Sequence, residues 1–213
     1  MKYKVMIVED QTMPRELFEL RVQASERFEL ALSIDNAALA DVYCLRFPVD
    51  LILMDVITRD GENGLDAAAR IKRAFPQIKI IIVTSMPECS YLSRAREIGV
   101  ESFWYKEEQR ESLLDVMERT MNGESVYPGA SPELTLGMAS SYQFTERELD
   151  ILREITSGDT NQEIADRLNM SVATVKTHIL NMLEKTGFRN RTELAVRARE
   201  SGLVIPDRKN EAL

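Results

Sequence analysis

The chain has 213 residues, of which 44% are hydrophobic and 29% charged, and its formal net charge is −8. This length allows two domains with a core each, and the composition is ordinary for soluble proteins. No apolar run approaches the ~20 residues that a membrane-spanning helix needs. The charged start MKYKVMIVED lacks the pattern of a signal peptide, and two cysteines, Cys44 and Cys89, suit a reducing cytosol. We therefore expect a cytoplasmic protein without a membrane partner.

Apolar segments of strand length alternate with segments of helical periodicity over residues 1–121. The expected strands are residues 3–8, 28–34, 49–54, 78–83 and 101–105. The expected helices are residues 14–24, 37–46, 64–75, 90–98 and 109–121. The third and fourth strands are almost wholly apolar (VDLILM and IKIIIV), as strands covered on both faces should be. The pattern predicts a five-stranded parallel, doubly wound α/β domain of flavodoxin-like order 2-1-3-4-5.

Polar residues follow the carboxyl ends of these strands, where open parallel sheets bind ligands. They are Glu9, Asp10, Asp55, Thr84 and Lys106. Clustered carboxylates favour a bound cation, and oxygen-only ligation suits Mg²⁺. A metal, a carboxylate nucleophile, a hydroxyl and an ammonium together make a site for an aspartyl phosphate. Each residue alone is more often a turn or cap residue, but the five in this order favour function.

Residues 122–143 are rich in Gly, Pro and Ser and predict a linker. Beyond it, residues 144–213 form a second domain that we expect to be all-α with four helices. Thr145 and Glu148 have the spacing of a capping box, Thr160 or Asn161 can cap the next helix, and Ser171 can cap the one after. Three short amphipathic helices with tight turns are the layout of a helix-turn-helix, whose second helix enters the DNA major groove.

Charge supports DNA binding by this half, although the whole chain is acidic. Residues 172–199 carry six Lys or Arg against two Glu, which is the electrostatic pattern expected at a phosphate backbone. The recognition helix is expected over residues 172–186. Its core side is expected to hold Val175, Ile179, Met182 and Leu183. The candidate DNA contacts are Thr174, Lys176, Thr177, Leu180, Asn181, Lys185 and Arg189, and assigning them to bases or phosphates stays open.

These motifs resemble a known family over nearly the whole chain. Residues 1–121 resemble the receiver domain of two-component response regulators, and residues 144–206 resemble the LuxR-type helix-turn-helix of the NarL/FixJ family. The resemblance implies that Asp55 accepts a phosphoryl group from a sensor histidine kinase. It implies a Mg²⁺ site formed by Glu9, Asp10, Asp55 and the Ile57 carbonyl. It also assigns phosphoryl binding and switching to Thr84, Ser85, Lys106 and Phe103, with Trp104 a candidate for exposure at the output face.

The resemblance further implies an active homodimer on double-stranded DNA, formed through the receiver's α4–β5–α5 face or its neighbours. Leu194 and Val196 of the last helix are either dimer contacts or plain core. The loop ITRDGENGLD after Asp55 is one residue longer than is common in the family and lacks its usual Met-Pro. Ile57 and Met86 are apolar and are expected to shield the acyl phosphate from water.

The function that best fits these observations is a phosphorylation-dependent transcriptional regulator that is not an enzyme acting on other substrates. One alternative is an aspartyl-phosphate phosphatase of the haloacid-dehalogenase type, but that class needs a D-x-D pattern after the first strand, where this chain has Glu9-Asp10. Another alternative is a phosphorylation-independent regulator whose receiver only dimerises, which the altered loop favours and the five site residues disfavour.

Overall fold

The computed structural model of the chain describes residues 2–59, 63–86, 88, 90–106 and 111–204. It divides into two compact units: the first holds the described residues up to Met86 and Tyr91–Gly129, and the second holds Glu88, Ser90 and the described residues from Ala130 onward. Cys89 and residues 109–110, where the sequence predicts the start of a helix, lie outside the described residues. In the part of the chain that is described, no helix is long and apolar enough to cross a membrane.

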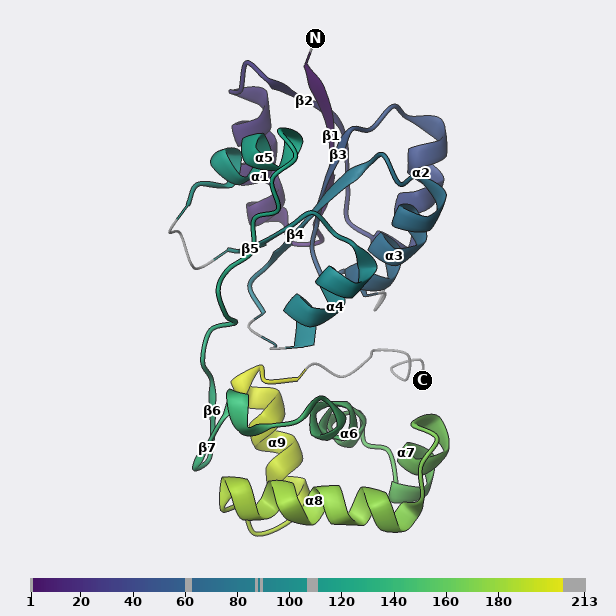
Figure 1. Ribbon diagram of the computed structural model, residues 1–213, viewed down its shortest axis with the longest axis vertical. Helices are drawn as coiled ribbons and strands as arrows, with labels where there is room; N and C mark the ends of the chain where they lie inside the picture. The colour runs from purple at the N-terminus through teal and green to yellow at the C-terminus, as the bar shows by residue number, and fades with distance from the viewer. Residues whose placement is uncertain (1, 60–62, 87, 89, 107–110, 205–213) are drawn as a thin grey trace. The chain divides into compact units, whose positions relative to one another are not determined.

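The first unit is built around a parallel sheet of order β2-β1-β3-β4-β5, which confirms the predicted topology (Figure 1). Its strands are β1 (Tyr3–Val8), β2 (Phe28–Ile34), β3 (Leu51–Met54), β4 (Lys79–Thr84) and β5 (Ser102–Tyr105). Its helices are α1 (Thr12–Gln23), η1 (Ala37–Leu39), α2 (Ala40–Arg46), α3 (Gly64–Ala74), α4 (Ser90–Ile98) and α5 (Leu113–Met121). The predicted β1 and β2 match in both bounds, and the other predicted strands differ by at most two residues at an end.

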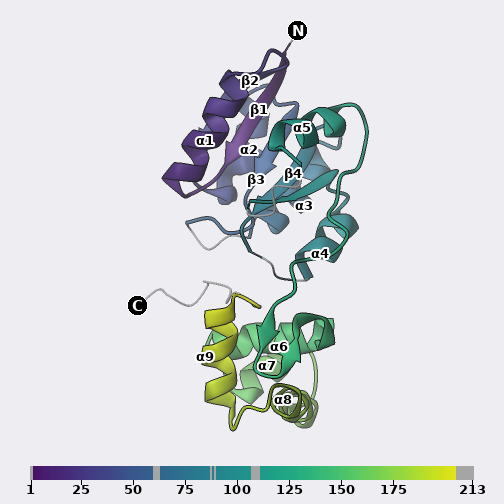
Figure 2. The same cartoon turned by 90° about the vertical axis from the view of Figure 1, so that its left-hand side faces the viewer.

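The central strands bury side chains on both faces, because helices cover each side of the sheet. Val5 and Ile7 of β1 pack into the core that includes α1 and α5, whereas Met6 and Val8 pack into the core of α2, α3 and α4. This alternation follows from the two-residue period of a strand. Figure 2 shows α1 in front of the sheet in that view. On α2, Cys44 is a buried free thiol.

Trp104 of β5 is buried, which makes the expectation of its exposure wrong. Its ring meets Phe18 of α1 edge-on, with centroids 6.5 Å apart, and its indole N–H donates to the Glu111 carbonyl at 3.0 Å. The residue faces the core that α1 and α5 cover. Strand alternation accounts for this, because Phe103 and Tyr105 take the opposite face.

The second unit packs helices around a core of its own. It contains α6 (Glu146–Thr156), α7 (Asn161–Arg167), α8 (Val172–Thr186) and α9 (Arg191–Ser201). The stretch predicted as a linker also carries structure, namely the antiparallel pair β6 (Thr135–Leu136) and β7 (Ala139–Ser140), followed by η2 (Ser141–Gln143). Leu136 and Ala139 belong to the core of this unit, so that part of the linker is an integral piece of it.

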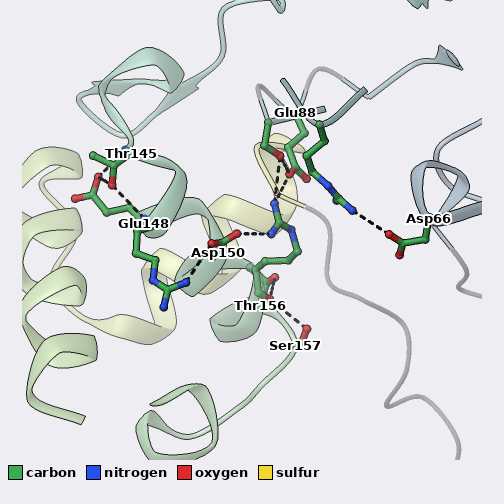
Figure 3. A network of polar contacts seen from close by, with 11 residues as sticks. Asp66, Glu88, Thr145, Glu148, Asp150, Thr156 and Ser157 are labelled. Carbon is green, nitrogen blue, oxygen red and sulfur yellow. Dashed lines mark hydrogen bonds and ion pairs between the residues drawn. The ribbon is translucent and has the colours of Figure 1, made fainter. Parts of the chain in front are cut away.

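The helices of this unit begin at the residues that the sequence predicts. The Thr145 hydroxyl accepts from the Glu148 N–H at 3.2 Å, and a Glu148 carboxylate oxygen accepts from the Thr145 N–H at 2.8 Å (Figure 3). Thr160 caps α7 with the same capping box, and the Ser171 hydroxyl caps α8. The left-handed glycine Gly187 (φ 74°) ends α8 and fixes its length.

Candidate functional site

The acidic residues of the first unit converge at the carboxyl end of the sheet. Glu9 and Asp10 follow β1 and Asp55 follows β3, and the two strands are neighbours. Carboxylate oxygens of the three residues lie within 4.8 Å of one another. Lys106, which follows β5, places its Nζ 2.5 Å from Glu9 Oε2 and 2.8 Å from Asp55 Oδ2. One ammonium thus bridges two buried carboxylates.

Burial dominates the electrostatics of this cluster. It raises the pKa of Glu9 to about 7, with the Asp55 charge adding to the shift. Burial also raises the pKa of Asp55, against the opposing effect of Lys106. Desolvation alone would lower the pKa of Lys106, but Asp55 and Glu9 outweigh it and raise the pKa. The charged forms of Glu9 and Asp55 are therefore disfavoured with Lys106 as their cation, and a further cation would stabilise them.

The donor set fits Mg²⁺. Carboxylate oxygens are the ligands that this ion prefers, and Asp10 is half-buried, which leaves room for the waters that Mg²⁺ keeps. Bound there, the ion would lie against Asp10 and Asp55, with Glu9 nearby. The Ile57 carbonyl, expected as a further ligand, stays a prediction. Ile57 is half-buried and pairs with Asn63 in an isolated antiparallel bridge.

Two further predicted residues, Thr84 and Ser85, lie at the end of β4 and just beyond it. Thr84 ends that strand fully buried, and its hydroxyl accepts from the Met86 N–H at 3.1 Å. Its carbonyl accepts from the Lys106 N–H at 2.9 Å, which fixes the ends of β4 and β5 against each other. Ser85 is half-buried beside it. Phe103 is buried away from solvent, and its ring centroid is 5.0 Å from that of Tyr105.

Sequence reasoning missed two residues that support Asp55. Gly64 begins α3 so close to the Asp55 backbone that a Cβ there would lie 1.9 Å from the Asp55 carbonyl oxygen. Thr58 is fully buried, and its hydroxyl accepts from the Ala37 N–H at 3.1 Å, which ties the loop after β3 to η1. Both roles depend on contacts between separate segments, and the only signal in the sequence was the position of these residues within the loop.

Helix α8 of the second unit has a mostly polar outer surface. The core side of α8 matches the prediction, with Val175, Ile179 and Met182 buried and Leu183 half-buried. The exposed candidates for DNA contact are Thr174, Lys176, Thr177, Leu180, Asn181 and Arg189. Leu180 keeps 60% of its surface exposed although it is apolar, which marks it as available to a partner.

Lys185 differs from the expectation of a phosphate contact. Its ammonium donates to both carboxylate oxygens of Glu148 at 2.7 and 2.8 Å and to the Gln143 carbonyl at 2.9 Å. The same group lies 5.8 Å from the centroid of the Phe144 ring. Lys185 therefore connects α8 to the start of α6, and its charge is already paired within the unit.

The two residues considered for dimer contacts, Leu194 and Val196, differ in their burial. Leu194 is fully buried in the core of the second unit, so its position is that of a core residue. Val196 is 50% exposed on the same helix and stays a candidate. A cavity of about 590 Å³ beside it is lined mostly by polar residues of α9 and the turn before it, Arg189 and Arg197 among them.

Comparison with known proteins identifies both units. Residues 5–118 match the response regulator receiver domain, and residues 142–198 match the bacterial regulatory proteins of the luxR family. The response regulator protein VraR of Staphylococcus epidermidis is 33% identical over 212 residues, which cover 96% of this chain and all of that protein. VraR of Staphylococcus aureus is 32% identical over the same length, with the same coverage of both chains.

Solved structures with the same fold include RcsB from Salmonella enterica serovar Typhimurium bound to a promoter in the presence of the phosphomimetic BeF₃⁻. That chain is 19% identical, with a TM-score of 0.60, and the match covers 96% of this chain and 100% of that one. The response regulator ChrA of a heme-sensing two-component system is 21% identical, with a TM-score of 0.52 and coverage of 95% and 99%. The chain is a two-component response regulator with a receiver domain and a LuxR-type DNA-binding domain, and thus belongs to a family of transcription regulators.

Proposed function

We propose that this protein is a phosphorylation-dependent regulator of transcription that acts in the cytosol, accepts a phosphoryl group on Asp55 and binds DNA through α8. The observation that carries the proposal is the bridge from Lys106 to Asp55 and Glu9, whose carboxylates gather with that of Asp10. The proposed donor is the phosphohistidine of a sensor histidine kinase. The only reactions proposed for this protein are transfer of the phosphoryl group to Asp55 and the slow loss of that group from Asp55.

The contacts of Asp55 support its proposed role as the nucleophile. Its Oδ1 accepts from the Val56 N–H at 2.7 Å, which leaves Oδ2 facing Lys106 at 2.8 Å. One carboxylate oxygen attacks phosphorus, the P–N bond to the kinase histidine breaks, and an acyl phosphate forms. Mg²⁺ held by Asp10 and Asp55 would supply charge neutralisation on the transferring group. Lys106 then exchanges a carboxylate partner for a phosphoryl oxygen, and the Thr84 hydroxyl offers another hydrogen bond.

Phosphorylation is proposed to shift the population toward a homodimer. Of the described receiver residues, those with large exposed apolar side chains lie on α1 and around α2. On α1 they are Met13 (82% exposed), Leu17 (47%) and Leu20 (63%). This helix packs on the same side of the sheet as α5. We therefore favour α1, a neighbour of the expected α4–β5–α5 face, as the receiver's contribution to the dimer.

DNA reading is assigned to the exposed side of α8. Lys176 suits guanine and Thr177 suits a hydroxyl contact or a thymine methyl, while Thr174 and Asn181 suit phosphates. The Thr177 hydroxyl donates to the Ala173 carbonyl at 3.0 Å, and the residue is exposed on α8. Arg189 adds positive charge just beyond the end of α8. A two-fold dimer would read half-sites about one helical turn apart.

The test is the intact mass of the purified protein after incubation with acetyl phosphate and Mg²⁺, compared with Asp55→Asn. We expect one added phosphoryl group in the wild type, lost in Asp55→Asn and on chelation. Both proteins are then titrated with promoter DNA before and after the treatment. A folded wild type that gains no mass would contradict the proposal and support a regulator whose receiver works without phosphorylation.

A further inference from the structure

The edge of the receiver sheet at β5 is covered by the segment that follows α5. Residues 124–127, here called the strap, run along β5, which is the last strand of the sheet. The Phe103 N–H donates to the Val126 carbonyl at 2.8 Å, and the Val126 N–H donates to the Ser102 hydroxyl at 3.1 Å. The strap thus covers part of this edge, where its Val126 carbonyl pairs with the N–H of Phe103.

The strap packs against both faces of the sheet. Val126 contacts the core that α1 and α5 cover, whereas Tyr127 contacts the core of α2, α3 and α4. The Tyr127 ring centroid is 6.2 Å from that of Phe103, and the Arg96 guanidinium lies 4.8 Å from the centre of the Tyr127 ring. The Tyr127 hydroxyl donates to the Val100 carbonyl at 2.8 Å. Tyr127 is therefore the main side-chain anchor of the strap.

Buried polar groups hold the backbone beneath the strap. Ser102 and Thr120 are fully buried, and their hydroxyls are 2.7 Å apart. The Thr120 carbonyl accepts from Lys79 Nζ at 2.7 Å. Because the Ser102 hydroxyl also accepts from Val126, moving the strap disturbs this buried network rather than a solvent-exposed contact. The strap is thus built into the receiver, although the sequence placed it in the linker.

The same strand that carries the strap also reaches the phosphoryl site. Lys106 follows β5, and Tyr105 pairs with Thr84 in the sheet register. Tyr105, Phe103 and Tyr127 form a row of rings with centroid separations of 5.0 and 6.2 Å. Phe103 is only 1% exposed, so a new position of its ring must be matched by movements of its neighbours, among which are Tyr105 and Tyr127.

We propose that the strap is a latch that responds to the phosphorylation state of the receiver. This rests on the proposed function, because Lys106 must exchange Glu9 or Asp55 for a phosphoryl oxygen. That exchange shifts the end of β5, the row of rings repacks, and Tyr127 leaves its place between Phe103 and Arg96. The strap then loosens from β5. The chain that leads to the DNA-binding unit is then held to the receiver at residues other than those of the strap.

Hydrogen exchange of the full-length protein tests the latch before any phosphorylation. In Tyr127→Ala the amides of Phe103 and Val126 are expected to exchange about tenfold faster than in the wild type, because the strap opens locally. Tyr127→Phe keeps the ring and is the matched control, with a smaller change. Phe103→Leu is expected to accelerate the Val126 amide as well, and the double variant is expected to add little. If Tyr127→Ala and Phe103→Leu accelerate exchange of the Val126 amide independently of each other, the proposal that the strap is a latch is overturned.

The second arm compares the same amides after phosphorylation, with the added mass measured in parallel. In the phosphorylated wild type both amides are expected to exchange about tenfold faster, and in Tyr127→Ala no further acceleration is expected. Full phosphorylation with an unchanged Val126 amide would overturn the proposal. Absence of added mass would instead refute the proposed function, and the comparison of unmodified variants would still decide whether Tyr127 and Phe103 act together.

Discussion

Replacing Gly64 with alanine should disturb the phosphoryl acceptor directly. The added Cβ would lie 1.9 Å from the Asp55 carbonyl oxygen and 3.0 Å from the Met54 Cγ, whereas ordinary contacts begin near 3.4 Å. The two segments must therefore separate by about 1.5 Å, the difference between 3.4 and 1.9 Å. Overpacking of this kind costs about 1–3 kcal/mol. Because Asp55 moves with its backbone, we also expect phosphorylation by acetyl phosphate to slow by about 100-fold.

Gly129→Ala provides the control, since nothing lies within 4 Å of a Cβ at Gly129. Thermal unfolding should show a melting temperature for Gly64→Ala about 4–12 °C below that of the wild type. The free energy of unfolding of Gly129→Ala should stay within about 0.5 kcal/mol of the wild-type value. The initial phosphorylation rate is followed by intact mass at fixed Mg²⁺. A Gly64→Ala protein with wild-type melting and a rate within roughly threefold of the wild type would refute the reasoning, because a 1 Å misplacement should cost far more.

Three further predictions concern pH, packing and the lifetime of the phosphoryl group. Burial, with help from Asp159, raises the pKa of Glu154 to about 7. Because the folded state binds this proton more tightly, the free energy of unfolding should fall between pH 4.5 and 7 by at most about 3 kcal/mol. Urea titrations should show a smaller fall in Glu154→Gln than in the wild type, with the part that comes from the raised pKa of Glu9 left in place. An unchanged fall would assign the whole pH dependence to other groups. Lys185→Met leaves the buried Glu148 without its cation and should cost about 1–3 kcal/mol in urea unfolding, whereas Lys176→Met, at an exposed position on the same helix, should cost under about 0.5 kcal/mol. Ile57→Asn and Met86→Glu admit a polar group beside the acyl phosphate, and mass measurements over time should show faster loss of the phosphoryl group than in the wild type. Slower loss in both variants would contradict the shielding role of the apolar pair.

The acidic site was predictable because each of its residues ends a strand. Strand periodicity is a local signal, and parallel strands in the order 2-1-3-4-5 bring their carboxyl ends to one edge of the sheet. Glu9, Asp55 and Lys106 therefore meet although they are far apart in sequence. Helix starts were predictable for the same reason, since a cap such as Thr145 and Glu148 is complete within four residues.

Features that depend on packing between distant segments escaped prediction. Lys185 reads as a phosphate contact because its position lies on a basic helix, but Glu148, which pairs with it, lies 37 residues away. Leu194 and Val196 look alike in sequence, and only the packing of α9 on the core separates the fully buried leucine from the half-exposed valine. The strap escaped because it lies in the Gly-, Pro- and Ser-rich stretch of residues 122–143, which favours a linker, while its partners lie on β5.

The position of the strap gives the receiver an asymmetry that bears on how it signals. Part of its β5 edge is covered by residues of the same chain, so pairing of another strand with Phe103 would first have to displace Val126. The large apolar side chains exposed on the described receiver residues lie instead on α1 and around α2. The two surfaces are therefore suited to different roles. The β5 edge is suited to reporting the state of Asp55 to the chain beyond α5, and α1 is suited to a partner, so phosphorylation and pairing could be separated by substitutions at Tyr127 and Leu20.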